Sequence, residues 1–548
     1  MQNNQTNEKL LAEIERLKKE LREKKKYGLV WEDKSEDVVE MCKEKLPVLK
    51  EIKSKEILTD KNKPVNLLIE GDNYHALSVL NYTHKGKIDM IYIDPPYNTG
   101  NKDFIYNDKF IDREDSYRHS KWLSFMGKRL KLAKNLLKDT GIIFISIDDN
   151  EVAQLKVLMD DKSYGLFGEN NFVAQFIWNK KAGRQNDAKF VSTNHEYILC
   201  YLRNSKKGSM NLLPRTEELN KSYKNPDNDP RGPWTSVTLQ AKSGTDANVY
   251  EIIFPNKVSW KPPKGTYPKF NKDKLLGLYY DNRVWFGEKG KNVPRLKKFL
   301  SEVQQGLIPN TLLLSREVGN TQGAKEDYKK VLSNINFDNP KPLPLIKHLS
   351  IIGSNKDAIV LDFMAGSGTT GHAILELNKK DEGNRKFILC TNNENKICEE
   401  VTYPRVQRVI EGYKKNGNGE KVQGFGGNLK YFKTDFVDYE ESTDRNKIKL
   451  TKEVLEMLCV KEGTFELVTV NKEFKIFKNQ DHYAGIIFDQ LAIKEFKKAI
   501  KDIKEKISVY IFSLGDDSFE DEFEDMKQKV KLSPIPEAIL KVYRRIFK

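Results

Sequence analysis

Cysteine and histidine are scarce in this sequence, and they form no pattern typical of a metal site. The chain has five cysteines, at Cys42, Cys200, Cys390, Cys398 and Cys459, and no two are spaced as Cys-x-x-Cys. The seven histidines do not cluster with them. Scattered cysteines in odd number exclude a disulfide framework and a cysteine-based zinc site, and they fit a reducing compartment. We therefore expect no metal ion.

Long hydrophobic runs are also missing. The longest, such as residues 141–147, have the length of one strand, and the first residues contain no apolar signal-peptide core. A helix that crosses a membrane needs about 20 consecutive, mainly apolar residues. We therefore expect a cytoplasmic protein without membrane contact.

Charge and core-forming residues are both plentiful. Hydrophobic residues make up 38% of the 548 residues, charged residues 32% and aromatics 10%, which argues against a disordered chain. This length predicts two to four domains. The net charge of +15 suits a polyanionic partner such as nucleic acid. Lysine is abundant along the whole chain, however, so the charge also fits a generally lysine-rich protein.

Strands and helices alternate in two stretches of the chain. Strands are expected at 65–70, 88–93, 141–147, 172–178, 196–202, 359–362 and 386–390, and helices at 73–82, 122–137, 371–377 and 405–414. Such alternation predicts an α/β fold with a doubly wound, mainly parallel sheet. We assign residues 36–204 and 339–435 to the two halves of this domain.

Three further segments lie outside the α/β pattern. Residues 205–338 mix basic residues with tryptophan and tyrosine in short, irregular periods, which predicts an inserted domain. Leu10, Ile14, Leu17 and Leu21 predict a short amphipathic helix within residues 1–35, either docked on its own chain or pairing two chains. Residues 436–548 contain short strands and two helical stretches (494–505 and 536–546), which predict a C-terminal α+β domain.

The tetrapeptide Asp94-Pro95-Pro96-Tyr97 follows the expected strand 88–93 directly. The carboxyl ends of strands are where open α/β folds bind ligands. Asp94 and the carbonyl of Pro95 can each accept a hydrogen bond from an amine, and Tyr97 can stack on a planar ring. Two acceptors holding the exocyclic amine of a base favour a tetrahedral nitrogen whose lone pair faces an electrophile, so positioning carries most of the catalysis. A turn that only ends the strand is the structural alternative.

A glycine-rich turn, from Leu361 to Thr370, follows the expected strand 359–362 and begins a helix. Glycine lets the backbone approach a ligand closely. The turn lacks the Gly-Lys-Ser/Thr ending of a nucleotide P-loop and the Gly-x-Gly-x-x-Gly of a dinucleotide site. Asp362 can neutralise the amino group of an amino-acid moiety. A turn that serves only strand-to-helix packing is the alternative.

Together these motifs resemble the beta class of DNA amino-methyltransferases, in which Asp-Pro-Pro-Tyr precedes the glycine-rich motif. More closely, the chain resembles the modification (Mod) subunits of type III restriction-modification systems. The matching segments are Leu29-Val30-Trp31-Glu32, Ile69-Glu70-Gly71-Asp72-Asn73, Ile91 to Gly100, Asn339-Pro340-Lys341-Pro342 and the glycine-rich turn. The resemblance covers nearly the whole chain. It implies a Rossmann-like methyltransferase fold with permuted motif order and S-adenosylmethionine as cofactor.

The resemblance also implies a role for each matching residue. Asp94, Pro95, Pro96 and Tyr97 form the pocket for the target amine, which His195 and Glu196 border. The cofactor-binding set comprises Asp72, Lys341, Pro342, Asp362, Met364, Ala365, Gly366, Ser367, Gly368, Thr369 and Glu394. For His195 and Glu196, a locally satisfied pair at a strand edge is the alternative.

The sequence departs from the family pattern at two of these positions. Met364 stands where the family usually has phenylalanine, so ring stacking there is lost. No acidic residue that would grip the ribose is obvious, and Glu394 is the candidate, although its spacing exceeds the roughly 20 residues typical of dinucleotide folds.

The expected activity is site-specific transfer of a methyl group to the N6 amine of a flipped-out adenine in double-stranded DNA. The insert would be the target-recognition domain. A homodimer and a separate helicase-endonuclease (restriction) subunit are the implied partners, and the C-terminal domain is a candidate for subunit contacts. The alternatives are cytosine-N4 methylation, in which Ser more often replaces Asp94, an orphan enzyme without a restriction subunit, an RNA or protein-glutamine substrate, and a non-catalytic DNA-binding subunit.

Overall fold

The computed structural model describes residues 33–547, apart from 102, 182, 185–189, 304–305, 336, 416–418, 439–443, 516 and 518. It divides into two compact units. The main unit is formed by Met1–Ser209 with Thr311–Lys548, and the insert unit by Met210–Asn310. The amphipathic helix expected near the N-terminus lies outside the described residues.

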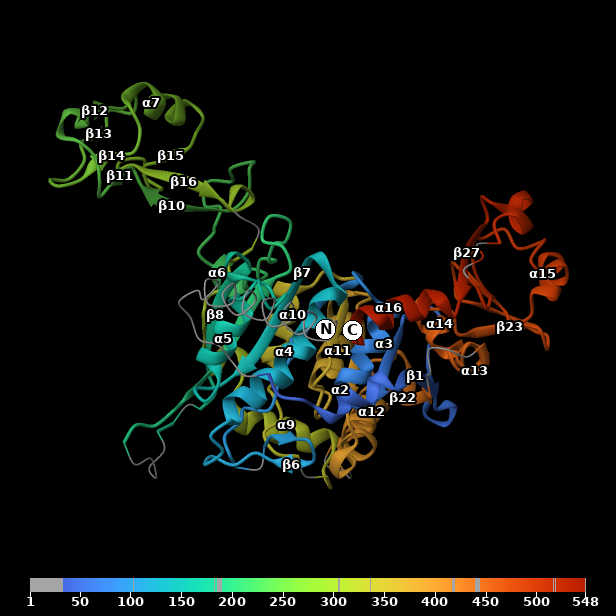
Figure 1. Cartoon of the computed structure of the whole chain (residues 1–548). Helices are drawn as coiled ribbons and strands as arrows, with labels where there is room; N and C mark the ends of the chain where they lie inside the picture. Colours follow the sequence, from blue (N-terminus) through green and yellow to red (C-terminus); the bar gives the residue numbers. More distant parts are fainter. Residues whose placement is uncertain are drawn as a thin grey trace, which may run out of the picture. The chain divides into compact units, whose positions relative to one another are not determined.

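Eleven strands form one sheet within the described part of the main unit (Figure 1). Its order is β1-β22-β3-β19-β18-β4-β7-β9-β8-β17, and β2 pairs with β22. The strands are β1 (Lys45–Glu51), β2 (Ile57–Leu58), β3 (Val65–Glu70), β4 (Ile88–Ile93), β7 (Leu137–Ile147), β8 (Phe172–Asn179), β9 (His195–Leu202), β17 (Leu312–Leu313), β18 (Ile359–Asp362), β19 (Lys386–Thr391) and β22 (Asn428–Asp438).

The centre of this sheet is parallel. All neighbours from β22 to β7 pair in parallel, whereas β1 with β22, and β9 with both β7 and β8, are antiparallel. Strand β18 joins β4 through Leu361 beside Ile91, so the two motif-bearing strands are direct neighbours despite their distance in the sequence. The predicted mainly parallel α/β sheet is confirmed.

Helices cover both faces of the sheet because its central strands are apolar on both sides. Ile91 and Ile143 share a core with Leu77 of α3 and Leu130 of α4. On the opposite face, α10 packs closely on β7 at Gly353, which has no side chain. A Cβ atom added to Gly353 would lie 2.7 Å from the Phe144 ring. In the described part of the main unit the α-helices are α2 (Asp37–Glu40), α3 (Asn73–Thr83), α4 (Arg118–Leu136), α5 (Val152–Asp160), α8 (Ser315–Val318), α9 (Thr321–Val331), α10 (Leu343–Gly353), α11 (Thr369–Asp381), α12 (Tyr403–Glu411), α13 (Asp444–Glu453), α14 (Leu455–Glu462), α15 (Ile493–Ala499) and α16 (Glu537–Phe547).

The C-terminal part of the main unit contains a second, five-stranded sheet. Its order follows the sequence: β23 (Glu466–Val470), β24 (Phe474–Lys478), β25 (Tyr483–Ile487), β26 (Ile507–Phe512) and β27 (Val530–Ile535). It has a core of its own around Phe496 of α15. Leu458 of α14 and Leu540 of α16 join the core of the central sheet, which connects the two layers. The main unit also contains two short antiparallel strand pairs, β5 (Ile105–Tyr106) with β6 (Lys109–Phe110) and β20 (Gly412–Lys414) with β21 (Lys421–Gln423).

The insert unit is built from short elements around its own apolar core, which includes Trp260 and Phe286. Its elements are α6 (Glu217–Asn220), α7 (Lys272–Tyr280), β10 (Trp234–Thr238), β11 (Gln240–Ala241), β12 (Ile252–Ile253), β13 (Ser259–Trp260), β14 (Tyr267–Pro268), β15 (Val284–Trp285) and β16 (Arg295–Phe299). The unit is shorter than the predicted insert at 205–338. Residues 311–338 carry β17, α8 and α9, and β17 extends the central sheet beside β8.

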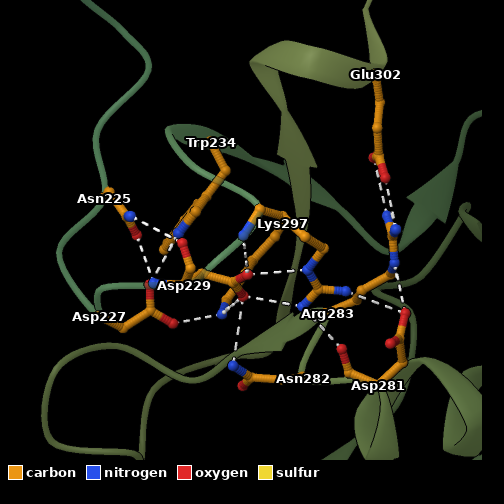
Figure 2. A network of polar contacts seen from close by, with 10 residues as sticks. Asn225, Asp227, Asp229, Trp234, Asp281, Asn282, Arg283, Lys297 and Glu302 are labelled. Carbon is orange, nitrogen blue, oxygen red and sulfur yellow. Dashed lines mark hydrogen bonds and ion pairs between the residues drawn. The ribbon is translucent and has the colours of Figure 1, made fainter.

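A network of ion pairs holds the insert unit together (Figure 2). The Lys297 side chain is fully buried, and its Nζ lies 3.0 Å from a carboxylate oxygen of the equally buried Asp229 and also contacts Asp227. Arg231 binds Asp229 as well, and Arg283 joins Asp281 to Glu302. Hydrogen bonds from Arg231 and Lys297 hold the pKa of Asp229 well below its usual range, although burial opposes them. The network therefore stays charged at neutral pH.

Among the described residues, no helix has both the length and the apolar composition needed to cross a membrane.

Candidate active site

One large cavity lies at the carboxyl ends of β4 and β18. Its volume is about 810 Å³, within the range of small-molecule sites in proteins. The residues that line it all belong to the main unit. They include both motifs, so the cavity joins Asp94-Pro95-Pro96-Tyr97 to the glycine-rich turn. That juxtaposition follows from the direct pairing of β4 with β18.

The loop that follows β4 is held from behind by buried side chains. Trp122 of α4 is fully buried, and its Nε1 donates to the Pro96 carbonyl at 2.7 Å. Asn98 adopts a φ of 57°, in the left-handed region that asparagine tolerates better than most residues. Its Nδ2 donates to Oε1 of the fully buried Glu151 at 2.5 Å, and His119 Nδ1 lies 2.7 Å from the same oxygen. These contacts fix the turn that carries Asp94.

Lys341 forms the polar centre of the cavity. Its Nζ lies 3.2 Å from Asp94 Oδ1 and 2.8 Å from Glu196 Oε2, and it donates to the Tyr97 hydroxyl at 2.6 Å. The Tyr97 hydroxyl in turn donates to Glu196 at 3.0 Å. Lys180 Nζ binds the other oxygen of Glu196 at 2.9 Å. We call Asp94, Tyr97, Lys180, Glu196 and Lys341 the Lys341 cluster.

Charges balance within the Lys341 cluster, and the pKa values reflect this. Burial disfavours the charged form of Glu196, but Lys341 and Lys180 outweigh it and lower the pKa to about 2. Burial also opposes the charge on Lys341, whereas Asp94 and Glu196 raise its pKa to about 12. For Asp94 the burial effect prevails over Lys341, so its pKa lies above the usual range. Asp94 is therefore the carboxylate of the cluster that takes up a proton most readily.

The glycine-rich turn forms the other wall of the cavity. Asp362 is buried at the end of β18, where it accepts hydrogen bonds from the Met364 amide at 3.0 Å and the Thr370 hydroxyl at 2.5 Å. Burial raises the pKa of Asp362 to about 7, even though both hydrogen bonds lower it. The carboxylate therefore gains from a cationic ligand beside it.

The backbone of this turn takes a course that only glycine adopts easily. Gly366 and Gly368 have φ values of 48° and 76°. Arg405 of α12 is buried behind the turn, and its Nη1 donates to the Ser367 hydroxyl at 2.9 Å and the Thr369 hydroxyl at 2.8 Å. Arg405 thus supports the turn from the side away from the cavity.

Twelve of the residues predicted for the site line this cavity, and five do not. The twelve are Asp94, Pro95, Pro96, Tyr97, Glu196, Lys341, Asp362, Met364, Ala365, Gly366, Ser367 and Thr369. The five are Asp72, His195, Pro342, Gly368 and Glu394. Gly368 and Pro342 lie next to lining residues in the chain and shape the backbone at the start of α11 and α10.

The other three predicted residues have local partners or are exposed. Asp72 accepts from the Tyr74 amide at the start of α3 and pairs with Arg129 at 3.4 Å. The His195 ring contacts the Tyr197 hydroxyl at 3.0 Å, as expected for a locally satisfied residue at a strand edge. Glu394 is exposed in the turn after β19. Their predicted ligand contacts remain predictions.

Several residues that shape the site were not found from the sequence. Lys180, Trp178, Asp148 and Phe337 line the cavity, and Arg405 and Glu151 support its walls. Lys180 directly follows the apolar strand β8, so its place at a strand end could have indicated a site residue. Arg405 offered no such indication, because it lies on a helix among other charged residues.

Comparisons with known proteins agree on one family. A family model described as DNA methylase matches residues 88–402. The StyLTI Mod subunit, a type III restriction-modification enzyme of Salmonella typhimurium (strain LT2), is 38% identical over 377 residues, which is 63% of this chain and 55% of that protein. The EcoPI Mod subunit of Escherichia phage P1 is 32% identical over 477 residues, 74% of this chain and 71% of that protein.

A type II enzyme is similar over a comparable length. The methyltransferase M.KpnI of Klebsiella pneumoniae is 33% identical over 361 residues, 62% of this chain and 84% of that protein. The chain thus spans little more than half of the StyLTI Mod subunit and larger shares of the other two proteins.

Proposed function

The chain belongs to the DNA methylase family, and on this premise we propose that it transfers a methyl group from S-adenosylmethionine to the N6 amine of an adenine flipped out of double-stranded DNA. The observation that carries the proposal is the single cavity lined by both Asp94-Pro95-Pro96-Tyr97 and the glycine-rich turn. An amine held at one wall therefore lies near a methyl donor held at the other.

The glycine-rich wall fits the methionine end of S-adenosylmethionine. Asp362 is a buried carboxylate whose pKa of about 7 falls when an ammonium group lies beside it. Gly366 carries no side chain over the cavity, and Arg405 fixes the turn from behind. When bound, the cofactor supplies an electrophilic methyl group.

The opposite wall prepares the nucleophile. Adenine N6 is a poor nucleophile because its lone pair is delocalised into the ring. Asp94 accepts one N6 hydrogen and the Pro95 carbonyl the other, which favours a lone pair directed at the methyl group. As the new N–C bond forms, N6 must lose one proton. Asp94 is placed to take it, and its raised pKa suits that task.

Lys341 must give way before the amine can bind. Its ammonium lies 3.2 Å from Asp94 Oδ1, so it competes with the N6 amine for that acceptor. Glu196 and the Tyr97 hydroxyl retain the ammonium when it leaves Asp94, because both contact it already. The Lys341 cluster thus keeps the ammonium within the site while Asp94 changes its partner from Lys341 to the N6 amine.

Within the family, the chain acts as the modification subunit of a type III system, with a separate restriction subunit as its partner. The Mod subunits among its relatives support this role. The insert unit, an independent fold inside the methylase domain, serves as the target-recognition domain. Adenine rather than cytosine is the target, because Asp stands at position 94 where cytosine-N4 enzymes more often have Ser.

Methylation-sensitive long-read sequencing of DNA from cells that express the chain tests the activity and the target together. We expect N6-methyladenine in one short sequence context, and none in cells that express the Asp94→Ala variant. That variant should bind DNA nearly as well as the parent, because only the amine contact is lost. N4-methylcytosine as the product, or methylation by Asp94→Ala at the parent's rate, would contradict the proposal.

Subunit association is a separate part of the proposal. We assign the homodimer contact to the C-terminal region, which carries no part of the cavity. Light scattering on the full chain and on a double variant, Val468→Glu with Val470→Glu, provides the test, because both side chains are exposed on β23 and their replacement leaves the core intact. The full chain should be dimeric and the variant monomeric, with an unchanged circular dichroism spectrum. An unchanged dimer would exclude this surface of the C-terminal region.

A further inference from the structure

A second cavity lies at the edge of the central sheet opposite the catalytic cavity. Strands β3, β18 and β19 run parallel, and they line this cavity where they begin, at Val65, Ile359 and Lys386. The catalytic cavity lies where β4 and β18 end. The six residues of β3 or of β19, at about 3.3 Å each, separate the two edges by roughly 20 Å. A ligand at one edge therefore leaves the other edge open.

The second cavity is small and has mainly apolar walls. Its volume is about 230 Å³, below the roughly 300 Å³ at which sites for drug-sized ligands begin. Leu67, Phe387 and Ile388 of the central sheet form one wall, and Val460 of α14 and Phe465 contribute another. The cavity therefore suits a ligand of only a few heavy atoms.

Three lysines interrupt the apolar walls. They are Lys87, Lys386 and Lys461, and none of them forms an ion pair with any residue that the structure describes. Lys87 Nζ donates to the Lys461 carbonyl at 3.0 Å, close to the end of α14. Lys461 Nζ lies 4.1 Å from the centre of the Tyr82 ring. These contacts place the ammonium groups but leave their charges without a carboxylate. We call this site the Lys461 cavity.

Glu462 also lines the Lys461 cavity, but its carboxylate is already bound on the side of the C-terminal sheet. It accepts hydrogen bonds from the Tyr510 hydroxyl at 2.5 Å and the Ser508 hydroxyl at 2.8 Å, and His482 Nε2 lies 2.9 Å away. Lys531, which pairs with Ser508 in the neighbouring strand, adds a further positive charge nearby. Positive charge is therefore in excess at this site.

His84 adds a buried polar group to the same site. It is 8% exposed, lies at the end of α3 and lines the Lys461 cavity. Its Nδ1 lies 2.8 Å from the Thr83 hydroxyl, and its Nε2 has no hydrogen-bond partner within the described part of the chain. With the Thr83 hydroxyl donating to Nδ1, Nε2 carries the ring hydrogen and can donate it to an anion.

The pKa values reflect the excess of positive charge. Burial lowers the pKa of Lys461 to about 8, and two nearby lysines add to the fall whereas Glu462 opposes it. Burial also lowers the pKa of His84 to about 3, with Lys87 and Lys386 contributing in the same direction. An anion placed among these groups would favour their charged forms and raise both pKa values.

We propose that the Lys461 cavity binds a small anion of the phosphate or pyrophosphate class between Lys87, Lys386 and Lys461. The lysines match the charge of such an anion, and the limited volume matches its size. The apolar walls strengthen the attraction, because charges interact more strongly away from water. A free anion is favoured over a phosphate of bound DNA, since the site lies at the sheet edge away from the catalytic cavity. The bound anion would join β19 and α3 to the end of α14.

Isothermal titration calorimetry of the full chain with pyrophosphate, at constant ionic strength, tests the proposal. We expect saturable binding, with a Kd that rises at least about tenfold in Lys386→Met and in Lys461→Met, because each variant lacks one charge-assisted contact. Pyrophosphate should also raise the Tm of the parent more than the Tm of either variant. Saturating duplex DNA and S-adenosylhomocysteine should leave pyrophosphate binding unchanged.

Lys85→Met provides the matched control. Lys85 is exposed and lies two residues before Lys87, but it does not line the Lys461 cavity. This variant should bind pyrophosphate like the parent. Absence of saturable binding by the parent would overturn the proposal, as would an equal Kd for the parent and Lys386→Met. Lys386 is exposed, so its replacement should leave the fold intact even if Lys461→Met does not fold.

Loss of pyrophosphate binding on addition of duplex DNA would also overturn the proposal, because it would assign the lysines to a surface that contacts nucleic acid. None of these measurements uses methyl transfer. Failure of this inference would therefore leave the proposed function standing, and failure of the proposed function would leave this inference standing.

Discussion

Lys341 is the residue on which the charge balance of the cavity depends. It is the cation shared by the two carboxylates Asp94 and Glu196, whereas Lys180 contacts Glu196 alone. The family resemblance implied that Lys341 belongs to the cofactor-binding set. Its contacts with Asp94 and Glu196 were not predictable, because they join segments 145 residues apart or more.

Replacement of Lys341 by methionine should shift the pH dependence of methyl transfer. Lys341 lowers the pKa of Asp94, so its loss raises that pKa further. Asp94 must be ionised to accept the N6 hydrogen, so the acidic limb of the kcat/KM profile, which reports the enzyme before substrate binds, should move to higher pH. A shift of one unit corresponds to about a tenfold loss of rate on that limb.

Lys180→Met is the control for this shift, because Lys180 neutralises Glu196 without touching Asp94. Its profile should keep the position of the parent's acidic limb. If both variants shift the limb equally, the effect comes from the total charge of the cavity and not from the contact with Asp94.

Glu151 makes the protein less stable as pH rises, whereas most carboxylates make a protein less stable as pH falls. Burial raises its pKa to about 8, although Asn98 and Arg118 lower it and Asp148 raises it slightly. The folded protein therefore holds a proton on Glu151 that the unfolded chain releases above about pH 4.5. The contribution of Glu151 to the free energy of unfolding has its full value at low pH, and it declines as pH rises from about 4.5 to about 8.

Glu151→Gln should remove this dependence. Glutamine keeps an oxygen for Asn98 but carries no charge, so the variant should melt at a higher temperature than the parent above pH 8. The difference should shrink as pH falls toward 5. Thermal denaturation between pH 5 and 9 provides the measurement, and a variant that is less stable at pH 9 would show that the ionised carboxylate is the stabilising form.

At the scale of elements, the most predictable strands were the apolar runs that stop abruptly at residues typical of turns. Strands 65–70, 88–93 and 359–362 have their predicted bounds, because each is an apolar run that stops at a residue or motif typical of turns. The helix expected at 494–505 ends at Ala499, and the segment 311–338 contains a strand and two helices that its irregular composition concealed. Those short elements are stabilised by packing on the main sheet, which a local pattern does not reveal.

The close contact of α10 with the sheet predicts one effect of substitution. A Cβ at Gly353 would lie 2.7 Å from Phe144 and 3.1 Å from the sulfur of Met90. Gly353→Val should therefore push α10 from the sheet and lower the free energy of unfolding by about 1–3 kcal/mol. Chemical denaturation measures the change.

Gly323→Ala in α9 is the control, since its nearest neighbour, Asn320 Oδ1, would lie at an ordinary contact distance of 3.4 Å. Alanine favours a helix over glycine by about 1 kcal/mol, so this variant should be as stable as the parent or more so. A Gly353→Val protein of unchanged stability would mean that α10 is free to move away from the sheet.

At the scale of the whole molecule, the two units have different sources of stability. The main unit buries apolar side chains from both faces of a large sheet, whereas the insert unit relies on a small core and on the ion pairs around Lys297 (Figure 2). Lys297→Met leaves the fully buried Asp229 without one of its two cations. Loss of one partner of a buried pair costs about 3–5 kcal/mol.

This variant should unfold in its insert unit first. Limited proteolysis should cut within residues 210–310 while the remainder of the chain resists, and cofactor binding to the main unit should persist. Lys298→Met, at the exposed neighbouring position, is the control and should be cut at the parent's rate. Equal resistance of both variants would show that the network contributes little to the unit.

The pairing of β4 with β18 has a consequence for synthesis on the ribosome. Ile91 leaves the ribosome long before its neighbour Leu361, since 270 residues separate them. At about 5–20 residues per second, one edge of β4 waits roughly 15–50 s for its partner strand. Throughout that interval the nascent chain presents an apolar strand edge, of the kind that promotes aggregation. The insert unit, residues 210–310, is synthesised entirely within the same interval. Its sequence is therefore complete before the last strands of the methylase sheet have been synthesised.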